Sequence, residues 1–223
     1  MHHAVRILLP ILFAIVASGC VTDDDDPLDE LGSTTAALTT VFETAPDALT
    51  CTPPYLVAAA PGEEGQWAAV RVGRTTGRPF RPERVRFVLR GSSPAAGTWC
   101  AGNAGPFRVR IFYGPDPTPA AQPTQVVSRT IAAGSGTAEQ TRTVDVGVRS
   151  LPIPADQWIF VAVEMVGDPA TDTGYNCLAG CGPRTRGSNW WSLATGAPYG
   201  WVELSTLGGF DFDIGMRVEG AYL

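Results

Sequence analysis

Apolar and polar residues alternate along most of the chain with a period of two. In "RVRFVLR", residues 84–90, Val85, Phe87 and Leu89 share one side and arginines occupy the other. Three further segments repeat this alternation: "FRVRIFY" (107–113), "TRTVDVGVR" (141–149) and "FDFDIGMRVEG" (210–220). A period of two predicts strands that bury one face and turn the other to water.

A different pattern in "QWIFVAVEMV", residues 157–166, predicts a central strand, because it is apolar on both faces except at Glu164. Five shorter runs complete a set of about ten strands: "YLVAAA", "QWAAVRV", "QVVSRTIA", "NWWSLA" and "GWVELSTL". Gly-rich and Pro-rich turns separate them, and no segment keeps a helical period. We therefore predict an all-β fold, an antiparallel two-sheet β-sandwich with jelly-roll or Greek-key connections.

The N-terminus has the pattern of an export signal. An eleven-residue apolar run, "ILLPILFAIVA" (7–17), leads into "ASGC" (17–20), with which it shares Ala17. This length suits a signal peptide rather than a membrane-spanning helix. "ASGC" resembles the lipobox of bacterial lipoproteins, which implies a signal peptide over residues 1–19 and lipid attachment at Cys20. Ordinary secretion is the alternative, with cleavage at an A-x-A-like site that leaves Cys20 as a free thiol.

The number of cysteines favours lipid attachment. There are five, an odd number for an exported protein. With Cys20 attached to lipid, Cys51, Cys100, Cys177 and Cys181 can form two disulfides in an oxidising compartment. Three pairings are possible; the closeness of the two cysteines in "CLAGC" favours Cys177–Cys181 together with Cys51–Cys100. A four-cysteine zinc site is the alternative, which the oxidising compartment disfavours.

Charge marks the boundary of the folded domain. Residues 21–46 contain seven of the 22 acidic residues and no arginine, which leaves 15 acidic residues and 15 arginines from Asp47 to Leu223. We therefore expect residues 20–46 to be a disordered acidic tether after the lipidated cysteine, and residues 47–223 to form a single neutral β-sandwich. The run Asp23–Asp26 is interpreted as solvated charge rather than as a calcium site.

The residue types that are missing exclude several kinds of chemistry. The chain has no lysine, and its two histidines, His2 and His3, are removed with the predicted signal peptide. The mature protein therefore has no imidazole base, histidine zinc site, Schiff-base lysine or P-loop lysine. The balanced charge, without a basic cluster, argues against a nucleic-acid partner. Carboxylates remain as catalytic candidates for glycan hydrolysis, namely Glu164, Glu203 and Asp145, although no spacing singles out a pair.

The order of the strand segments resembles one family of modules. "QWAAVRVG", "PERVRFVLRG", "FRVRIFYG", "SLPIPADQWIFVAVE" and "NWWSLATGAPYGWVELSTLGGFDFDIGMRVEG" follow one another much as in the jelly-roll modules of secreted bacterial adhesins of the cleaved-adhesin type. The similarity covers most of residues 60–220. It implies adhesion or glycan binding as the expected function.

Four aromatic residues form the candidate ligand-binding cluster: Trp190, Trp191, Tyr199 and Trp201. Neighbouring strand residues point to opposite faces, so one of Trp190 and Trp191 is expected inside and the other outside. An exposed indole beside Tyr199 would give sugar rings a flat apolar surface. The alternative is that the hairpin is packed under a loop or sheet, because tryptophan is usually largely buried.

One loop holds oxygen ligands of the kind that calcium prefers. In "GDPATDTGYN" these are Asp168, Asp172 and Asn176. Modules of the family that the chain resembles often hold calcium, but the spacing matches no defined calcium loop. Asp and Asn are also ordinary turn residues, so calcium is a possible ligand and no other cofactor is expected.

These observations predict an exported lipoprotein that acts as a binding or adhesion module, with a glycan or a surface protein as its partner. The lipid bilayer is a second partner, through acylated Cys20. Val21 after that cysteine, where Asp would suggest inner-membrane retention, favours the outer membrane. The alternatives are a carboxylate-dependent glycan-degrading enzyme and a structural envelope protein without a small ligand.

Overall fold

A computed structural model describes residues 39–44, 55–59, 62–90, 100, 106–132, 140–147, 150–167, 176–182, 187–208 and 211–223. All of them belong to the unit Ala37–Leu223. The predicted lipobox with Cys20 lies outside the described residues, as do Cys51, Asp168 and Asp172, so what was inferred for them stays a prediction. Within the described part of the chain, no helix has the length and apolar character needed to cross a membrane.

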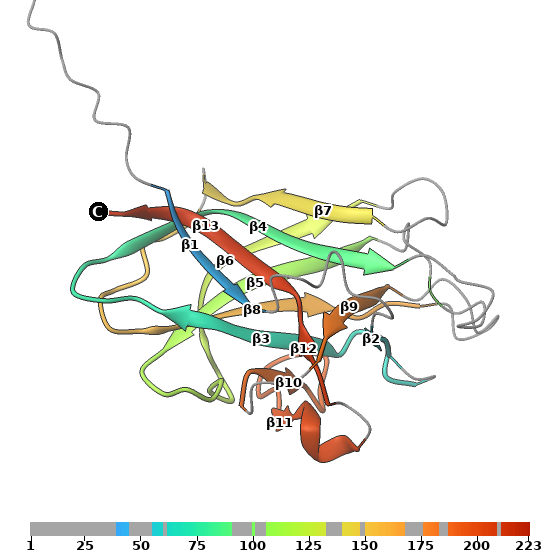
Figure 1. Cartoon of the computed structure of the whole chain (residues 1–223). Coiled ribbons are helices and arrows are strands. Elements are labelled where there is room, and N and C mark those ends of the chain that lie inside the picture. The colour runs from blue at the N-terminus through green and yellow to red at the C-terminus, as the bar shows by residue number, and fades with distance from the viewer. Residues whose placement is uncertain are drawn as a thin grey trace, which may run out of the picture. The chain divides into compact units, whose positions relative to one another are not determined.

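The first of two antiparallel sheets has seven strands. Its strand order is β1 (Thr40–Thr44), β13 (Met216–Tyr222), β4 (Phe80–Arg90), β9 (Cys177–Cys181) and β12 (Asp213–Ile214). Two strands pair off this path: β2 (Tyr55–Val57) joins β9, and β7 (Gln140–Asp145) joins β4. Figure 1 shows β1 in blue beside β13 in red, close to the C-terminus.

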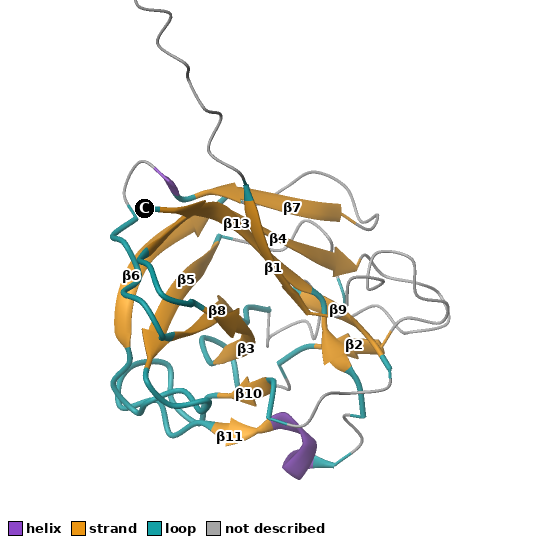
Figure 2. Cartoon of the chain, turned by 60° about the vertical axis from the view of Figure 1, so that its left-hand side comes forward, coloured by secondary structure: helices purple, strands orange, loops and turns teal. Residues whose placement is uncertain are grey.

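The second sheet has six strands. They run in the order β11 (Val202–Glu203), β10 (Asn189–Trp191), β3 (Trp67–Arg74), β8 (Trp158–Glu164), β5 (Phe107–Gly114) and β6 (Thr124–Ile131). The sheets pack against each other (Figure 2), and the chain crosses between them repeatedly. The predicted all-β sandwich is confirmed, and β8 is an inner strand between β3 and β5.

The core between the sheets follows the alternation in the sequence. Val85, Phe87 and Leu89 of β4 are buried in it, together with Val109 and Ile111 of β5. The opposite face of the seven-stranded sheet is polar, as its arginines predict. There the buried carboxylate of Glu219 on β13 forms ion pairs with Arg84, Arg86 and Arg217.

The predicted start of the folded domain is too late. Residues 40–44 were expected in the tether. They form β1 instead, and all five of them pair with residues 216–220 of β13. Phe42 explains why, because its ring packs edge-on against Phe80 with centroids 5.0 Å apart. The acidic composition of the region hid a strand that begins the sandwich.

Two further strand predictions are corrected. The expected single strand over residues 210–220 is divided into β12 and β13 at Gly215, where the chain changes partner from β9 to β4 and β1. The segment after β11 was also expected to be extended, but Leu204–Leu207 forms a 3-10 helix, η3.

The favoured disulfide pairing is wrong. Cys100 is bonded to Cys177, with their Cα atoms 5.3 Å apart, and Cys181 is disulfide-bonded as well. Cys177 and Cys181 stand at the two ends of the extended strand β9. Four residues of strand span about 13 Å, whereas a disulfide needs Cα atoms about 4.4–6.8 Å apart. "CLAGC" is therefore a strand rather than a small disulfide-closed loop.

Candidate binding face on the six-stranded sheet

The outer face of the six-stranded sheet is apolar, unlike that of the seven-stranded sheet. Strands β3 and β8 carry apolar residues on both faces, so Ala68 and Val161 enter the core between the sheets while Ala69 and Phe160 lie on the outside. Seven aromatic residues gather on this outside, and we call them the aromatic face: Trp67, Phe112, Trp158, Phe160, Trp190, Tyr199 and Trp201.

Two loops pack beside these rings. The segment 193–201 folds back on itself through Leu193 N–H, which donates to the carbonyl of Tyr199 at 2.9 Å. It meets the loop after β5 twice, because Tyr199 N–H donates to Ala121 O and Trp201 Nε1 donates to Ala120 O, each at 3.0 Å. The Pro-rich sequence of residues 115–123 therefore builds one wall of the aromatic face.

The structure separates the four predicted aromatic residues. Trp191 points into the core between the sheets, whereas Trp190, Tyr199 and Trp201 belong to the aromatic face. Opposite orientation of Trp190 and Trp191 is thus confirmed, but both are buried, and so is Tyr199. Trp201 is partly exposed, and its ring lies 4.9 Å from that of Tyr199. Instead of the expected open platform, Tyr199 belongs to a packed cluster in which Trp158 and Trp201 are the partly exposed indoles.

Arginines lie over the buried indole of Trp67. The guanidinium carbons of Arg108 and Arg110 on β5 lie 5.2 Å and 4.3 Å from the centroid of its ring. Trp67 is completely buried and donates from Nε1 to the carbonyl of Thr195 at 3.0 Å. A guanidinium within about 6 Å of an indole centroid is attracted by the negative face of the ring. Trp67 thus holds two cations at the surface of the face.

Two more arginines lie over an indole at the start of β8, that of Trp158. Arg71 and Arg74 of β3 place their guanidinium carbons 4.8 Å and 5.7 Å from the centroid of Trp158. Burial lowers the pKa of Arg71, against the opposing effect of the Glu203 carboxylate. Arg71 also donates to Pro117 O at 2.9 Å, which connects it to the loop after β5.

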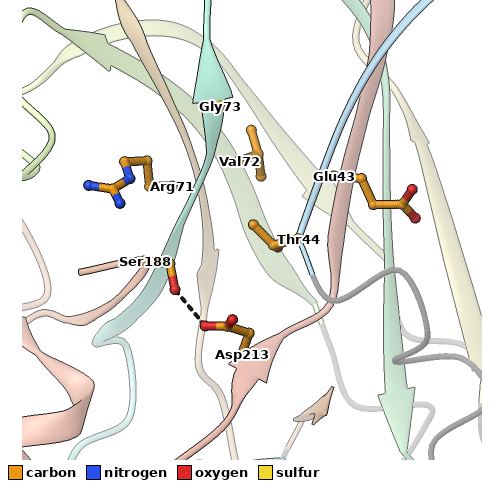
Figure 3. A pocket seen from close by; sticks show the side chains of 7 residues that line it. All are labelled: Glu43, Thr44, Arg71, Val72, Gly73, Ser188 and Asp213. Atoms are coloured by element: carbon orange, nitrogen blue, oxygen red, sulfur yellow. Dashed lines mark hydrogen bonds between the residues drawn. The ribbon is translucent and has the colours of Figure 1, made fainter. Parts of the chain in front are cut away.

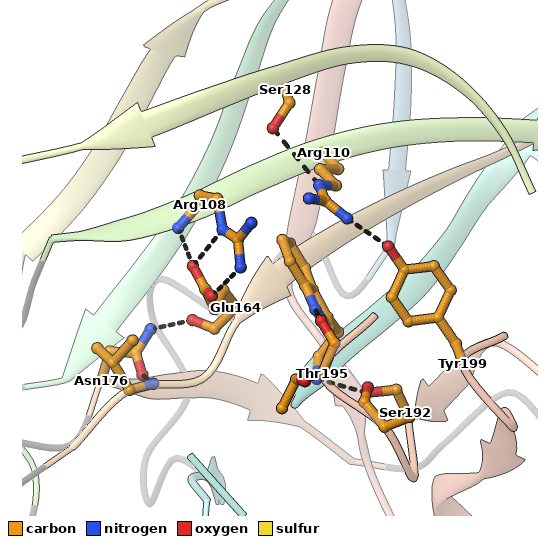
Figure 4. Close-up of polar contacts among 11 residues, drawn as sticks. Arg108, Arg110, Ser128, Glu164, Asn176, Ser192, Thr195 and Tyr199 are labelled. Atoms are coloured by element: carbon orange, nitrogen blue, oxygen red, sulfur yellow. Dashed lines mark hydrogen bonds and ion pairs between the residues drawn. The ribbon is translucent and has the colours of Figure 1, made fainter. Parts of the chain in front are cut away.

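Arg108 is neutralised by Glu164. Figure 4 shows the two side chains joined side by side, with Arg108 Nε donating to Glu164 Oε2 at 2.9 Å. The Arg108 backbone N–H donates to the same oxygen at 2.9 Å. The side-chain hydrogen bonding to Glu164 raises the pKa of Arg108. Glu164 was a catalytic candidate, but its carboxylate is engaged in holding Arg108.

Among the described residues, Arg110 has only neutral partners. It donates to the hydroxyl of Tyr199, and its Nε donates to Ser128 Oγ on β6 at 3.4 Å (Figure 4). It forms no ion pair with a carboxylate among the residues that the structure describes. Of the two guanidinium groups over Trp67, that of Arg110 is therefore the one without a carboxylate partner among the described residues.

The other carboxylate candidates lie apart from this group. Asp145 is exposed on β7, in the other sheet. Glu203 on β11 accepts a hydrogen bond from Gly187 N–H at 2.8 Å. This arrangement brings no two of Glu164, Glu203 and Asp145 together as a catalytic pair.

Of the three residues predicted as calcium ligands, the structure describes only Asn176, and its side chain is occupied by other bonds. Asn176 is completely buried, its Nδ2 donates to Glu164 O at 2.7 Å, and its Oδ1 accepts from Val166 N–H at 2.6 Å. The amide is thus occupied in joining the start of β9 to the end of β8. Among the described residues, no three His, Cys, Asp or Glu side chains are grouped as metal ligands.

A separate cavity of about 290 Å³ opens between the edges of the two sheets (Figure 3). It is lined by Glu43, Thr44, Arg71, Val72, Gly73, Ser188 and Asp213. Asp213 accepts hydrogen bonds from Ser188 Oγ at 2.5 Å and Asn189 Nδ2 at 2.8 Å, while Asn189 Oδ1 accepts from Ile214 N–H. These bonds connect β10 to β12, so the buried polar groups of this cavity serve to join the two sheets.

Comparison with protein-family models, with curated proteins and with solved structures found no match for this chain. Four residues of the site were not singled out by the sequence as functional candidates: Trp67, Arg108, Arg110 and Trp158. The signal was nevertheless present: "QWAAVRV" lacks a polar face, and "FRVRIFY" places Arg108 and Arg110 on the side opposite its core residues.

Proposed function

We propose that this protein is an exported, lipid-anchored module that binds a glycan on the aromatic face. The observation that carries the proposal is the composition of that face, where guanidinium groups lie over indole rings on the outside of a sheet. Indoles cover the apolar side of a sugar ring, and guanidinium groups donate hydrogen bonds to its hydroxyls. Partly exposed Trp158 and Trp201 are the rings available for such contact.

The enzyme alternative has weaker support. General acid catalysis or nucleophilic attack by Glu164 needs a carboxylate that is free to exchange a proton or form a bond. Its bidentate pair with Arg108 opposes both roles, because the guanidinium occupies both carboxylate oxygens. A bound glycan is therefore expected to be released unchanged.

Glycan binding is tested with full-length protein and immobilised polysaccharides of varied composition. Trp201→Ala should weaken binding about tenfold, because aromatic anchors at the centre of an interface contribute most of its affinity. Trp201→Phe, which keeps a ring, should retain most of it. Leu207→Ala is the matched control, since Leu207 is an exposed apolar residue on η3.

Thermal melting of each variant separates loss of binding from loss of fold. Undiminished binding by folded Trp201→Ala and Trp158→Ala variants would remove the aromatic face as the glycan site. Release of reducing sugar that disappears in Glu164→Gln would favour the enzyme instead.

Anchoring is proposed on the resemblance of "ASGC" to a lipobox and on the odd number of cysteines. Metabolic labelling with a radioactive fatty acid should mark the wild-type protein and leave Cys20→Ser unlabelled. The wild-type protein should also enter the detergent phase on phase separation, while the variant stays in the aqueous phase. An unlabelled wild-type protein would contradict the proposal and favour ordinary secretion.

A further inference from the structure

Arg108 and Arg110 stand two residues apart on β5 and share the indole of Trp67, yet their electrostatic surroundings differ. Arg108 is paired with Glu164, whereas Arg110 is held by the hydroxyls of Tyr199 and Ser128. A hydroxyl orients a guanidinium without neutralising it. One positive charge thus remains at a fixed position on the aromatic face.

Arg110 and the two hydroxyls that it contacts also carry donor hydrogens without an acceptor among the described residues. A guanidinium carries five N–H groups, and Nη2 of Arg110 makes no hydrogen bond to a described residue. The hydroxyls of Tyr199 and Ser128 accept from Arg110, so each keeps its own proton to donate. Neither proton has an acceptor among the described residues. Three side chains in contact with one another therefore carry donor hydrogens and one positive charge.

We infer that the ligand bound on the aromatic face carries a carboxylate, which Arg110 binds with help from Ser128 and Tyr199. This rests on the proposed glycan binding and specifies its class: an acidic polysaccharide that contains uronic acid or another carboxylated sugar. A planar carboxylate matches the guanidinium fork, through two parallel N–H···O bonds.

The charge of the site favours a carboxylate over a phosphate. Of the two arginines over Trp67, only Arg110 has no carboxylate partner among the described residues, since Arg108 is neutralised by Glu164. A carboxylate carries one negative charge, while a phosphate monoester carries about 1.5–2 at neutral pH. A single guanidinium balances the charge of a carboxylate but leaves part of the charge of a phosphate monoester uncompensated.

The test compares two polymers that differ only in charge. Full-length protein is titrated with a uronic-acid homopolymer and with the same polymer after its carboxyl groups are reduced to alcohols. Wild-type protein should bind the acidic polymer at least tenfold more tightly. Arg110→Gln should lose this preference and keep its affinity for the reduced polymer, and Arg110→Lys should recover part of the preference because it keeps the charge but not the fork.

Arg129→Gln is the control, since it removes the same charge from β6, where Arg129 Nε donates to Asp145 O rather than joining the aromatic face. It should leave the preference unchanged. Equal binding of both polymers by wild-type protein would overturn the carboxylate inference while glycan binding stands, and binding of neither would remove the proposed function itself. An equal loss of preference in Arg129→Gln, or tighter binding of a phosphorylated glycan than of the acidic polymer, would also overturn the inference.

Discussion

Replacing Trp67 by alanine should lower the free energy of unfolding by about 3–5 kcal/mol, the range measured for truncation of large buried aromatic residues. Trp67 is completely buried in the aromatic face, and its ring packs edge-on against Tyr199 at 6.3 Å. The substitution also leaves the Thr195 carbonyl without its indole donor. Urea denaturation followed by circular dichroism measures the change.

Trp67→Phe is the matched control for this prediction. It keeps a ring beneath Arg108 and Arg110 but removes the hydrogen bond to Thr195, so it should destabilise the protein less than alanine does. A loss below about 1 kcal/mol for Trp67→Ala would show that the cluster is not an independent part of the core, contrary to this prediction.

Loss of the Cys100–Cys177 disulfide should be comparably costly. The two cysteines are 77 residues apart, and a cross-link that closes a loop of this length stabilises the folded state by about 4 kcal/mol in the chain-entropy account. Replacing both cysteines by alanine avoids a free thiol and should lower the urea midpoint accordingly. Cys181, which is also disulfide-bonded, is left unchanged.

Peptide mapping without reduction checks that the double variant keeps the disulfide of Cys181. The same mapping of wild-type protein should yield one peptide pair that joins Cys100 to Cys177. A change in stability below about 1 kcal/mol would mean that the unfolded chain gains little freedom when this bond is absent, against the chain-entropy account.

The sequence predicted the sandwich well because burial follows strand periodicity directly. Alternation in "RVRFVLR" identified the core side of β4, and the uninterrupted apolar run "QWIFVAVEMV" identified β8 as a strand covered on both faces. The same property implied that something must cover the outer side of β8. What covers it, the segment 193–201, could not be identified, because contacts between distant segments leave no periodic trace.

Site residues were harder to predict, because their roles depend on partners far away in the chain. Glu164 seemed a catalytic candidate until its position beside Arg108, 56 residues earlier, was known. Asn176 similarly seemed a metal ligand, although it bonds the backbone of β8. The predicted Cys177–Cys181 disulfide was wrong for a similar reason. The two cysteines are close in sequence, but the extended strand β9 holds them apart.

Strand β1 gives the domain a defined response to mechanical load. If the domain is anchored and binds a glycan as proposed, a pull at its N-terminal end reaches this five-residue strand before any other described strand. The ladder to β13, the Phe42 ring seated against Gly73 and Phe80, and the bond from Thr44 Oγ1 to Ile214 O resist that pull together. Strand β1 is therefore the element on which the proposed anchoring and glycan binding would place load first.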